Sequence, residues 1–255
     1  LERRIDERTM IRLNAAAELR GKSFAEAAAL LDSGVESGDR TERKFLGVLF
    51  GPDFWRLTGE HLVLVFVSLA ASIAVGVPLG ILSNKVTAMT QVVLGTVGVI
   101  QTIPSLALFA FLIALLGTIG TVPALIALFL YALLPIVRNT YAGLEAVSKG
   151  MRQAALALGL SRRDRLWRIE LPLALPSILA GIKTSAVINV GTATIAAFVG
   201  AGGYGERIVS GLALNDSATL LAGAIPAAAL ALIVQGAFEF GEHRFGWMAR
   251  SRGVP

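Results

Sequence analysis

The sequence Gln153-Ala154-Ala155-Leu156-Ala157-Leu158-Gly159 precedes a basic run that leads to Ile169-Glu170-Leu171-Pro172. Both lie in a polar segment, residues 142–172, which separates long apolar segments. The basic residues of this segment are Lys149, Arg152, Arg162, Arg163, Arg165 and Arg168. Because positive charge marks the cytoplasmic loops of membrane proteins, we expect residues 142–172 to be a cytoplasmic loop between membrane spans.

The composition is that of an integral membrane protein. Of the 255 residues, 55% are hydrophobic and 16% are charged, with a mean hydropathy of +0.68, whereas soluble domains carry about 25% charged residues. The net charge of +5 gathers in residues 1–44, in 149–168 and near the C-terminus, without interleaved aromatic residues, which disfavours nucleic-acid binding. The sequence has no cysteine and only two histidines, so it excludes thiolate chemistry and disfavours a metal site.

Five apolar segments are candidates for membrane spans, since about 20 apolar residues cross a bilayer. They are residues 62–83, 87–117, 122–141, 173–199 and 218–240. The second segment is too long for one straight span and too short for two, and Pro104 lies in its middle. We therefore expect one broken, tilted segment there, with two spans as the alternative, and an all-α membrane domain over residues 45–255.

The distribution of lysine and arginine also predicts the direction of the spans. The loop 142–172 and the C-terminal tail are both basic and are separated by two spans, so both are expected on the cytoplasmic side. Five spans then place the N-terminus outside, where residues 1–44 form a charged, helix-prone lead-in and linker.

Within the loop, the composition predicts two short helices. Residues 150–160 favour a helix, Gly159 permits a turn, and Ser161 is a suitable N-cap for a second helix through Arg162 and Asp164 to Trp167. We expect Pro172 to stop this second helix before the next span. A small apolar patch for docking is expected at Ala154, Ala155, Leu158 and Leu160. The alternative is a solvated loop that only orients the protein.

The spacing of Gln153-Ala154-Ala155, Gly159, Ile169 and Leu171-Pro172 resembles the EAA loop of permeases from bacterial binding-protein-dependent ABC importers, with Gln153 in place of the usual Glu. Four further segments look like the osmoprotectant (glycine betaine, carnitine or choline) branch, over roughly residues 56–245. They are residues 102–105, 133–140, 171–178 and 200–205. Permeases for methionine share several of these features. Residues 1–32 resemble the C-terminal end of an osmoprotectant-binding protein, with a plain amphipathic lead-in as the alternative.

This resemblance implies a type I (MetI-like) permease core of about five spans in the bacterial inner membrane, with a coupling helix seated in a cleft of an ATPase subunit. The partners implied are two ATP-binding cassette subunits, a substrate-binding protein or fused binding domain, and a second permease copy. ATP and Mg²⁺ belong to the ATPase, and no cofactor is expected on this chain. The residues implied in coupling are Gln153, Ala154, Ala155, Gly159, Leu160, Ser161, Arg162, Asp164, Ile169 and Pro172.

The sequence holds no nucleotide-hydrolysing motif. The glycines of residues 200–205 match a dinucleotide fingerprint in letters, but they follow a membrane span and not a strand. No phosphate-binding loop of the G-x-x-x-x-G-K-[ST] type occurs, so the energy is expected from a partner and the chain is not expected to be an enzyme. Candidate pathway-lining residues are Gln101, Thr102, Pro104, Asn189, Thr192 and Thr194, with hydrogen bonding between helices as the alternative role.

These observations favour the membrane subunit of an ATP-driven importer for small osmoprotectants, which works by alternating access. The alternatives are a permease for another small solute such as methionine and a membrane scaffold that binds a cytoplasmic partner. An ion-coupled carrier is disfavoured because the spans lack buried acids.

Overall fold

The computed structural model describes residue 11, residues 13–16 and residues 45–251, and every element from Phe45 onward in this part of the chain is helical. In chain order the first helices are α3 (Phe45–Leu49), α4 (Phe54–Lys85), α5 (Thr87–Thr102), α6 (Ser105–Leu116), α7 (Thr121–Glu145), α8 (Lys149–Ala157) and α9 (Arg162–Arg165). They are followed by a π-helical turn (Leu166–Glu170), α10 (Leu171–Ile195), a 3-10 turn (Ala196–Val199), α11 (Gly205–Ala213) and α12 (Ser217–Ser251). The interpretation of residues 1–44 falls almost wholly outside the described residues.

Several helices are long and apolar enough to cross a membrane. Four runs qualify alone: Phe54–Lys85, Thr121–Glu145, Arg162–Val199 and Ser217–Gly241. The pair α5 and α6 qualifies together, so the described chain holds up to five spans, which confirms the all-α membrane fold. The first run begins at Phe54 and not at residue 62, whereas the last run, Ser217–Gly241, agrees with the predicted span 218–240 and α12 continues beyond it to Ser251.

The second span is broken between α5 and α6, which are bent by 102° relative to each other. Ile103 has an extended backbone, as expected for a residue that precedes proline, and Pro104 cannot donate a helix hydrogen bond. The carbonyl of Ile103 instead accepts a hydrogen bond from the Tyr131 hydroxyl on α7. A backbone group released by the break is thus satisfied inside the protein, as a nonpolar environment demands.

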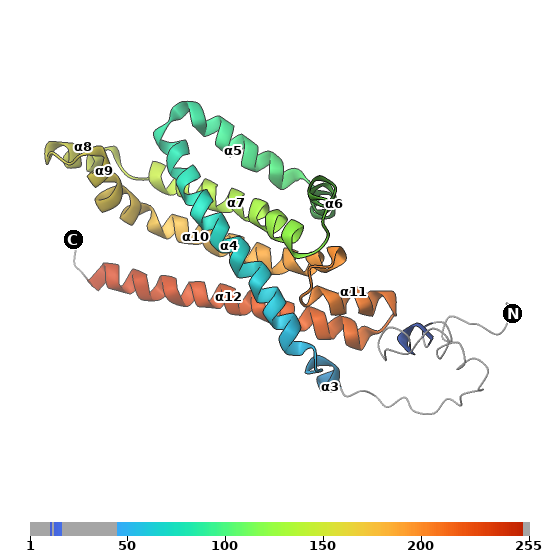
Figure 1. Cartoon of the computed structure of the whole chain (residues 1–255). Helices are drawn as coiled ribbons and strands as arrows, with labels where there is room; N and C mark the ends of the chain where they lie inside the picture. Colours follow the sequence, from blue (N-terminus) through green and yellow to red (C-terminus); the bar gives the residue numbers. More distant parts are fainter. Residues whose placement is uncertain (1–10, 12, 17–44, 252–255) are drawn as a thin grey trace.

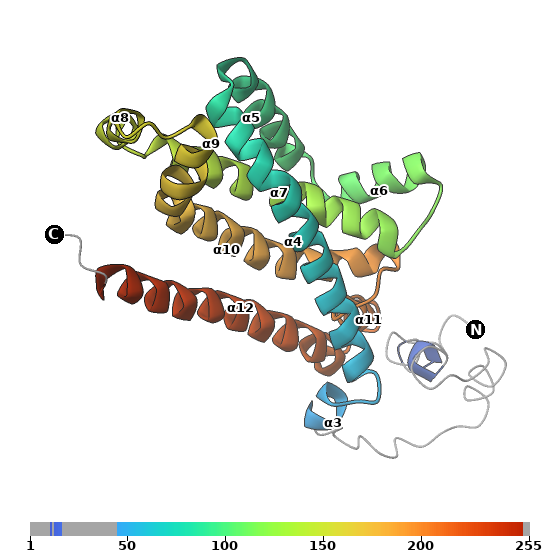
Figure 2. The same cartoon turned by 60° about the vertical axis from the view of Figure 1, so that its left-hand side comes forward.

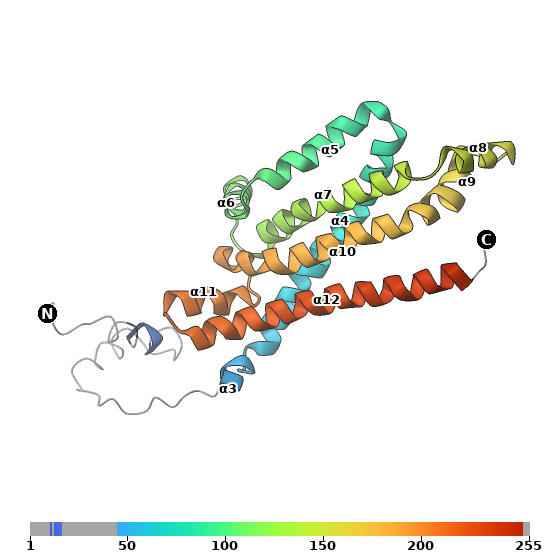
Figure 3. The same ribbon diagram turned by 180° about the vertical axis from the view of Figure 1, so that it is seen from behind.

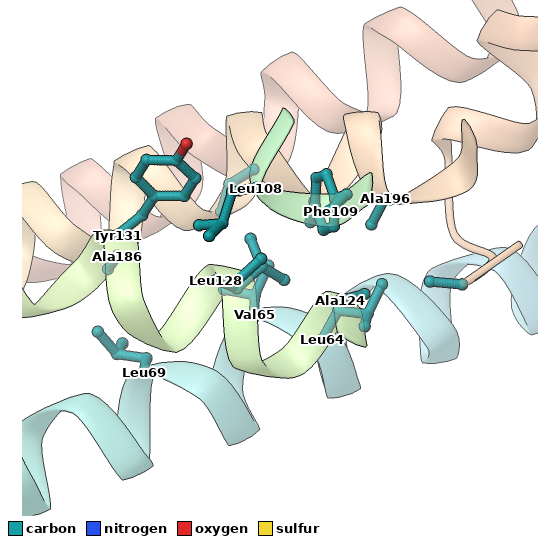
Figure 4. Close-up of a cluster of buried hydrophobic side chains, with 14 of the residues drawn as sticks. Leu64, Val65, Leu69, Leu108, Phe109, Ala124, Leu128, Tyr131, Ala186 and Ala196 are labelled. Carbon is teal, nitrogen blue, oxygen red and sulfur yellow. The ribbon is translucent and has the colours of Figure 1, made fainter. Parts of the chain in front are cut away.

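The largest core lies where α4, α6, α7 and α10 meet. Figure 4 shows this cluster of buried apolar side chains, which includes Val65 and Leu69 of α4, Phe109 of α6, Leu128 of α7 and Ala186 of α10. Small residues let the helices approach closely outside this cluster. A Cβ added at Gly80 of α4 would lie 2.5 Å from the Thr140 Cβ of α7. Such small-residue contacts are a usual means of packing helices in membranes.

The two ends of the bundle carry different parts of the chain. Figure 1 shows α8 and α9 at one end together with the C-terminal end of α12, and Figures 2 and 3 show the same arrangement from other sides. Helices α3 and α11 lie at the opposite end. The basic loop and the end of the last span therefore lie on one side, which agrees with the charge distribution.

We expect Tyr131→Phe to destabilise the protein, because it leaves the Ile103 carbonyl without a partner. A buried unsatisfied polar group costs about 1–3 kcal/mol. The measurement is thermal unfolding of the purified chain in detergent. Tyr141→Phe is the matched control, since it removes a hydroxyl from the same helix for which the described residues show no hydrogen bond. Equal unfolding temperatures for the two variants would contradict the role of Tyr131.

Candidate functional site

The loop that follows α7 folds as two helices joined by a tight turn. The Ser148 hydroxyl caps α8 by accepting a hydrogen bond from the Met151 amide at 3.2 Å. At the other end of α8, Gly159 adopts a left-handed conformation with φ of +72°. The amides of Gly159 and Leu160 return to the carbonyls of Leu156 and Ala155, which is the Schellman arrangement of helix ends. A glycine is therefore needed where the loop turns.

The second helix begins at a serine N-cap. The Ser161 hydroxyl accepts a hydrogen bond from the Asp164 amide at 3.1 Å and donates one to the Asp164 carboxylate at 2.6 Å. Ser161 is thus the side-chain N-cap of α9, and the bond between the two side chains fixes the direction of its hydroxyl. This cap fixes the start of α9 at Arg162, directly after the turn at Gly159.

The expectation that Pro172 stops this second helix is wrong. Helix α9 continues through the π-helical turn into α10, so that Arg162–Val199 is one helical run. Pro172 lies in the first turn of α10, and the Leu171 amide before it bonds to the Leu166 carbonyl, five residues back. A π-helical turn widens the helix, and this local change accommodates a proline that can neither donate nor fit a regular α-helical turn.

The predicted coupling residues differ in exposure. Ala155 is only 1% exposed, so the apolar docking patch expected to include it is made of other side chains. Met151, Leu156 and Leu158 are the large apolar side chains that α8 and its end expose. Half-buried members of the predicted set are Leu160, Asp164 and Ile169, and exposed members are Gln153, Ala154, Gly159, Ser161, Arg162 and Pro172.

A buried carboxylate joins the loop to the spans. The Glu170 side chain is 1% exposed and forms an ion pair with Lys85 at the end of α4. Its Oε1 lies 3.0 Å from the Arg165 Nε and 3.7 Å from the Arg152 Nε. Glu170 is not among the predicted coupling residues, although a lone acid in an apolar, proline-containing stretch next to a basic run is a signal that could have indicated it.

The candidate pathway residues differ in how their polar atoms are bonded. Asn189 is fully buried and its amide donates a hydrogen bond to the Ser68 hydroxyl of α4 at 2.9 Å, so the structure gives it the interhelical role. Thr102 and Thr194 bond to carbonyls of their own helices. The Gln101 Oε1 is buried without a hydrogen-bond partner among the described residues. The Asn189 Oδ1 is likewise buried without a partner among the described residues, so Gln101 and Asn189 each present one unsatisfied polar atom.

At the end of the bundle opposite the loop, charged side chains form contacts that were not predicted from the sequence. Arg207 of α11 is 6% exposed, and its Nε and Nη2 donate to the Asp53 carboxylate at 3.1 and 2.6 Å. The hydrogen bonds from Arg207 hold the pKa of Asp53 below its usual range, and they outweigh partial burial, which acts in the opposite direction. Arg56 adds a bridge to Glu206 at 2.8 Å. These contacts fasten α11 to the start of α4.

Comparison with known proteins decides the family. The model described as "Binding-protein-dependent transport system inner membrane component" matches residues 76–246, which include the whole loop. The chain belongs to this family. It is therefore a multi-pass inner-membrane permease component, and ATP hydrolysis in such systems takes place on a separate subunit. The resemblance drawn from the loop is confirmed.

Two relatives from Bacillus subtilis (strain 168) carry the same system name, the glycine betaine/carnitine/choline transport system. The chain is 42% identical to permease protein OpuCB over 177 residues, which is 69% of this chain and 81% of OpuCB. It is also 42% identical to permease protein OpuCD over 200 residues, which is 78% of this chain and 82% of OpuCD. A structure of the MetNI methionine ABC transporter in an inward-facing conformation matches with a TM-score of 0.66 and 22% identity. That match covers 74% of this chain and 95% of the MetNI chain and shows the fold.

We expect Asp53→Asn to destabilise the permease at neutral pH, because it leaves the buried Arg207 without its counter-ion. The loss should be smaller than the roughly 3–5 kcal/mol of a fully buried pair, since the Asp53 side chain is 39% exposed. The folded-state pKa of Asp53 is lowered, so its contribution is present above about pH 4 and disappears as the pH falls through the lowered value.

The measurement is the unfolding temperature of both proteins across acidic and neutral pH. The difference between them should be constant at neutral pH and shrink in acid below about pH 4. Glu239→Gln removes an exposed carboxylate of α12 and serves as the control, with no such difference expected. A difference between Asp53→Asn and the parent that does not depend on pH would refute the charge argument.

Proposed function

We propose that this chain forms, with a second permease copy, the translocation pathway of an ATP-driven importer for small osmoprotectants such as quaternary ammonium compounds. The observation that carries the substrate class is 42% identity to permeases named for glycine betaine, carnitine and choline, over most of both chains. The likeness to the methionine transporter is at the level of fold. A substrate-binding protein, or a binding domain fused ahead of the spans, delivers the solute on the side opposite the loop.

Two ATPase subunits dock on the loops of the paired permeases, each over residues 150–168. The support is geometric, because α8 stands at one end of the bundle and exposes Met151, Leu156 and Leu158 beside charged and polar side chains. Exposed apolar side chains on a short, well-capped helix favour a protein partner over bulk water. ATP-driven closure of the ATPases then draws the two loops together and rocks the spans between inward-open and outward-open states.

The second permease copy covers part of the apolar surface that one chain leaves exposed. The broken span contributes Val99 of α5 and Leu106, Phe111 and Leu115 of α6, each at least half exposed. Lipid covers such side chains in a single chain, and a facing copy covers them in a pair. Gln101, Thr102, Pro104, Thr192 and Thr194 remain the candidate pathway-lining residues, whereas Asn189 is engaged inside the bundle. Because OpuCB and OpuCD share one system name, a related permease is the alternative partner.

The topology follows from the same arrangement. The basic loop, Lys85 and the C-terminal end of α12 lie at one end of the bundle, which we assign to the cytoplasm. Helix α3 lies at the other end, so the chain ahead of Phe45 enters from outside.

The test is uptake by the complete importer, reconstituted in liposomes from this chain, its ATPase and its binding protein. Radiolabelled glycine betaine, carnitine or choline should enter only with ATP, and an ionophore should not abolish the uptake. Methionine in excess should not compete. Uptake without ATP would favour an ion-coupled carrier. Competition by methionine would indicate methionine, and not an osmoprotectant, as the substrate. The lack of any uptake would favour a membrane scaffold.

We expect Gly159→Val to uncouple ATP hydrolysis from transport. A left-handed conformation costs an ordinary residue about 1–2 kcal/mol, so valine would change the turn between α8 and α9 without entering the spans. Membrane insertion should be normal, and uptake per ATP hydrolysed should fall. Gly236→Val on α12, where the added side chain also meets open space but φ is not positive, is the control. Unchanged uptake in Gly159→Val would count against the docking role of the loop.

A further inference from the structure

Helix α8 is placed by polar contacts more than by packing. It stands away from the bundle in Figures 1 and 3, and it packs extensively on none of the described spans. Its Arg152 reaches back in two directions. One guanidinium nitrogen donates to the Leu144 carbonyl near the end of α7 at 2.6 Å, and the Nε lies 3.7 Å from Glu170. Side chains, together with the chain connections, thus tie α8 to the membrane part.

Glu170 is the residue that contacts the charged side chains of three elements. Its carboxylate pairs with Lys85 of α4, with Arg165 of α9 and with Arg152 of α8, so three elements meet on one buried side chain. The π-helical turn makes this possible. Residues five apart do not face each other on an α-helix, but the i to i+5 closure of the π-helical turn brings Arg165 and Glu170 onto one face.

The charge balance makes the carboxylate the indispensable member. A buried carboxylate is stable only when it is paired, and here it is surrounded by more cations than it needs for neutrality. The loss of one cation leaves Glu170 paired with two others. The loss of the carboxylate leaves three cations next to each other without a counter-ion, so they repel.

The contact with α8 is the loosest of the three. The Arg152 Nε is buried and has no hydrogen-bond partner among the described residues, although it points at the carboxylate from 3.7 Å. Arg165, by contrast, donates a hydrogen bond at 3.0 Å. A small shift of α8 is therefore enough to close or open the Arg152 contact, whereas α4 and α9 stay attached to Glu170.

We propose that Glu170 is the positioning residue that transmits movement of α8 to the ends of α4 and α10. The inference rests on the proposed function, in which the ATPase docks on the loop, and it adds the route by which that movement enters the spans. On α8 the contact with Glu170 is made by Arg152, and on α4 it is made by Lys85.

The experiment uses the complete importer in liposomes and measures substrate uptake and ATP hydrolysis on the same sample. In Glu170→Gln, uptake per ATP should fall about tenfold, the scale of one lost charged hydrogen bond, while ATP hydrolysis and co-purification of the ATPase persist. Glu170→Asp keeps the charge and should restore part of the ratio. Glu145→Gln removes an exposed acid at the end of α7 and should leave the ratio unchanged.

Arg152→Gln guards the test against misfolding, since Glu170 keeps its ion pairs with Lys85 and Arg165, and co-purification of the ATPase checks that α8 still docks. This variant should also lower uptake per ATP. A normal ratio in Arg152→Gln or in Glu170→Gln would overturn the inference, and so would a parallel loss of hydrolysis and ATPase co-purification. Failure of the proposed function shows itself separately, as a parent importer without ATP-dependent uptake or without an ATPase cross-link to the loop.

Discussion

A backbone that crosses hydrocarbon must satisfy its hydrogen bonds within the protein, and this constraint is visible at two of the prolines. At Pro104 the helix breaks and bends by 102°, and Tyr131 satisfies the Ile103 carbonyl from the neighbouring span. At Pro172 the helix does not break, because the preceding turn is wound as a π-helix and lies near the end of the bundle. At these two prolines the backbone is accommodated differently, by a neighbouring side chain at Pro104 and by a change of helical winding at Pro172. The prolines Pro78, Pro135, Pro176 and Pro226 lie inside helices that continue past them.

Between the two ends the spans are held by close contact, and at the ends they are held by charge. Gly80 and Gly181 bring α4 and α10 against α7 so closely that an added Cβ would overlap a neighbour. In hydrocarbon, apolar side chains gain little free energy by leaving the lipid for one another. The close packing of the helices therefore matters more for their association than the hydrophobicity of their side chains. The two charged clusters lie where the helices end, with the Asp53–Arg207 pair at one end of the bundle and the Glu170 cluster at the other. The ends are therefore polar and specific, whereas the middle is apolar and well packed.

Much of this architecture was readable from the sequence because it depends on local rules. The apolar segments, the break at Pro104, the turn at Gly159 and the cap at Ser161 each follow from residues close together in the chain. The errors concern what local rules cannot see. Pro172 stays in a helix because of π-helical winding, and Ala155 is buried although the residues beside it are exposed. Glu170 meets Lys85 across 85 positions of sequence, and no local pattern predicts such a meeting.

The continuity of α9 with α10 changes how the loop relates to the spans. If the second helix stopped at Pro172, both short helices would be joined to the spans by flexible segments. Movement of a partner bound to them would then be absorbed by these segments and would not reach the spans in full. The structure instead makes α9 the first turn of a span, so a force on α9 enters α10 through a continuous helix. Helix α8 has no such continuity, because Gly159 and Ser161 separate it from α9. Its displacement can reach the spans through the contacts of Arg152, through the turn at Gly159 and through its connection to α7. Within the loop, α9 is continuous with a span, whereas α8 is joined to α9 through a turn. The buried carboxylate of Glu170 contacts side chains from both helices.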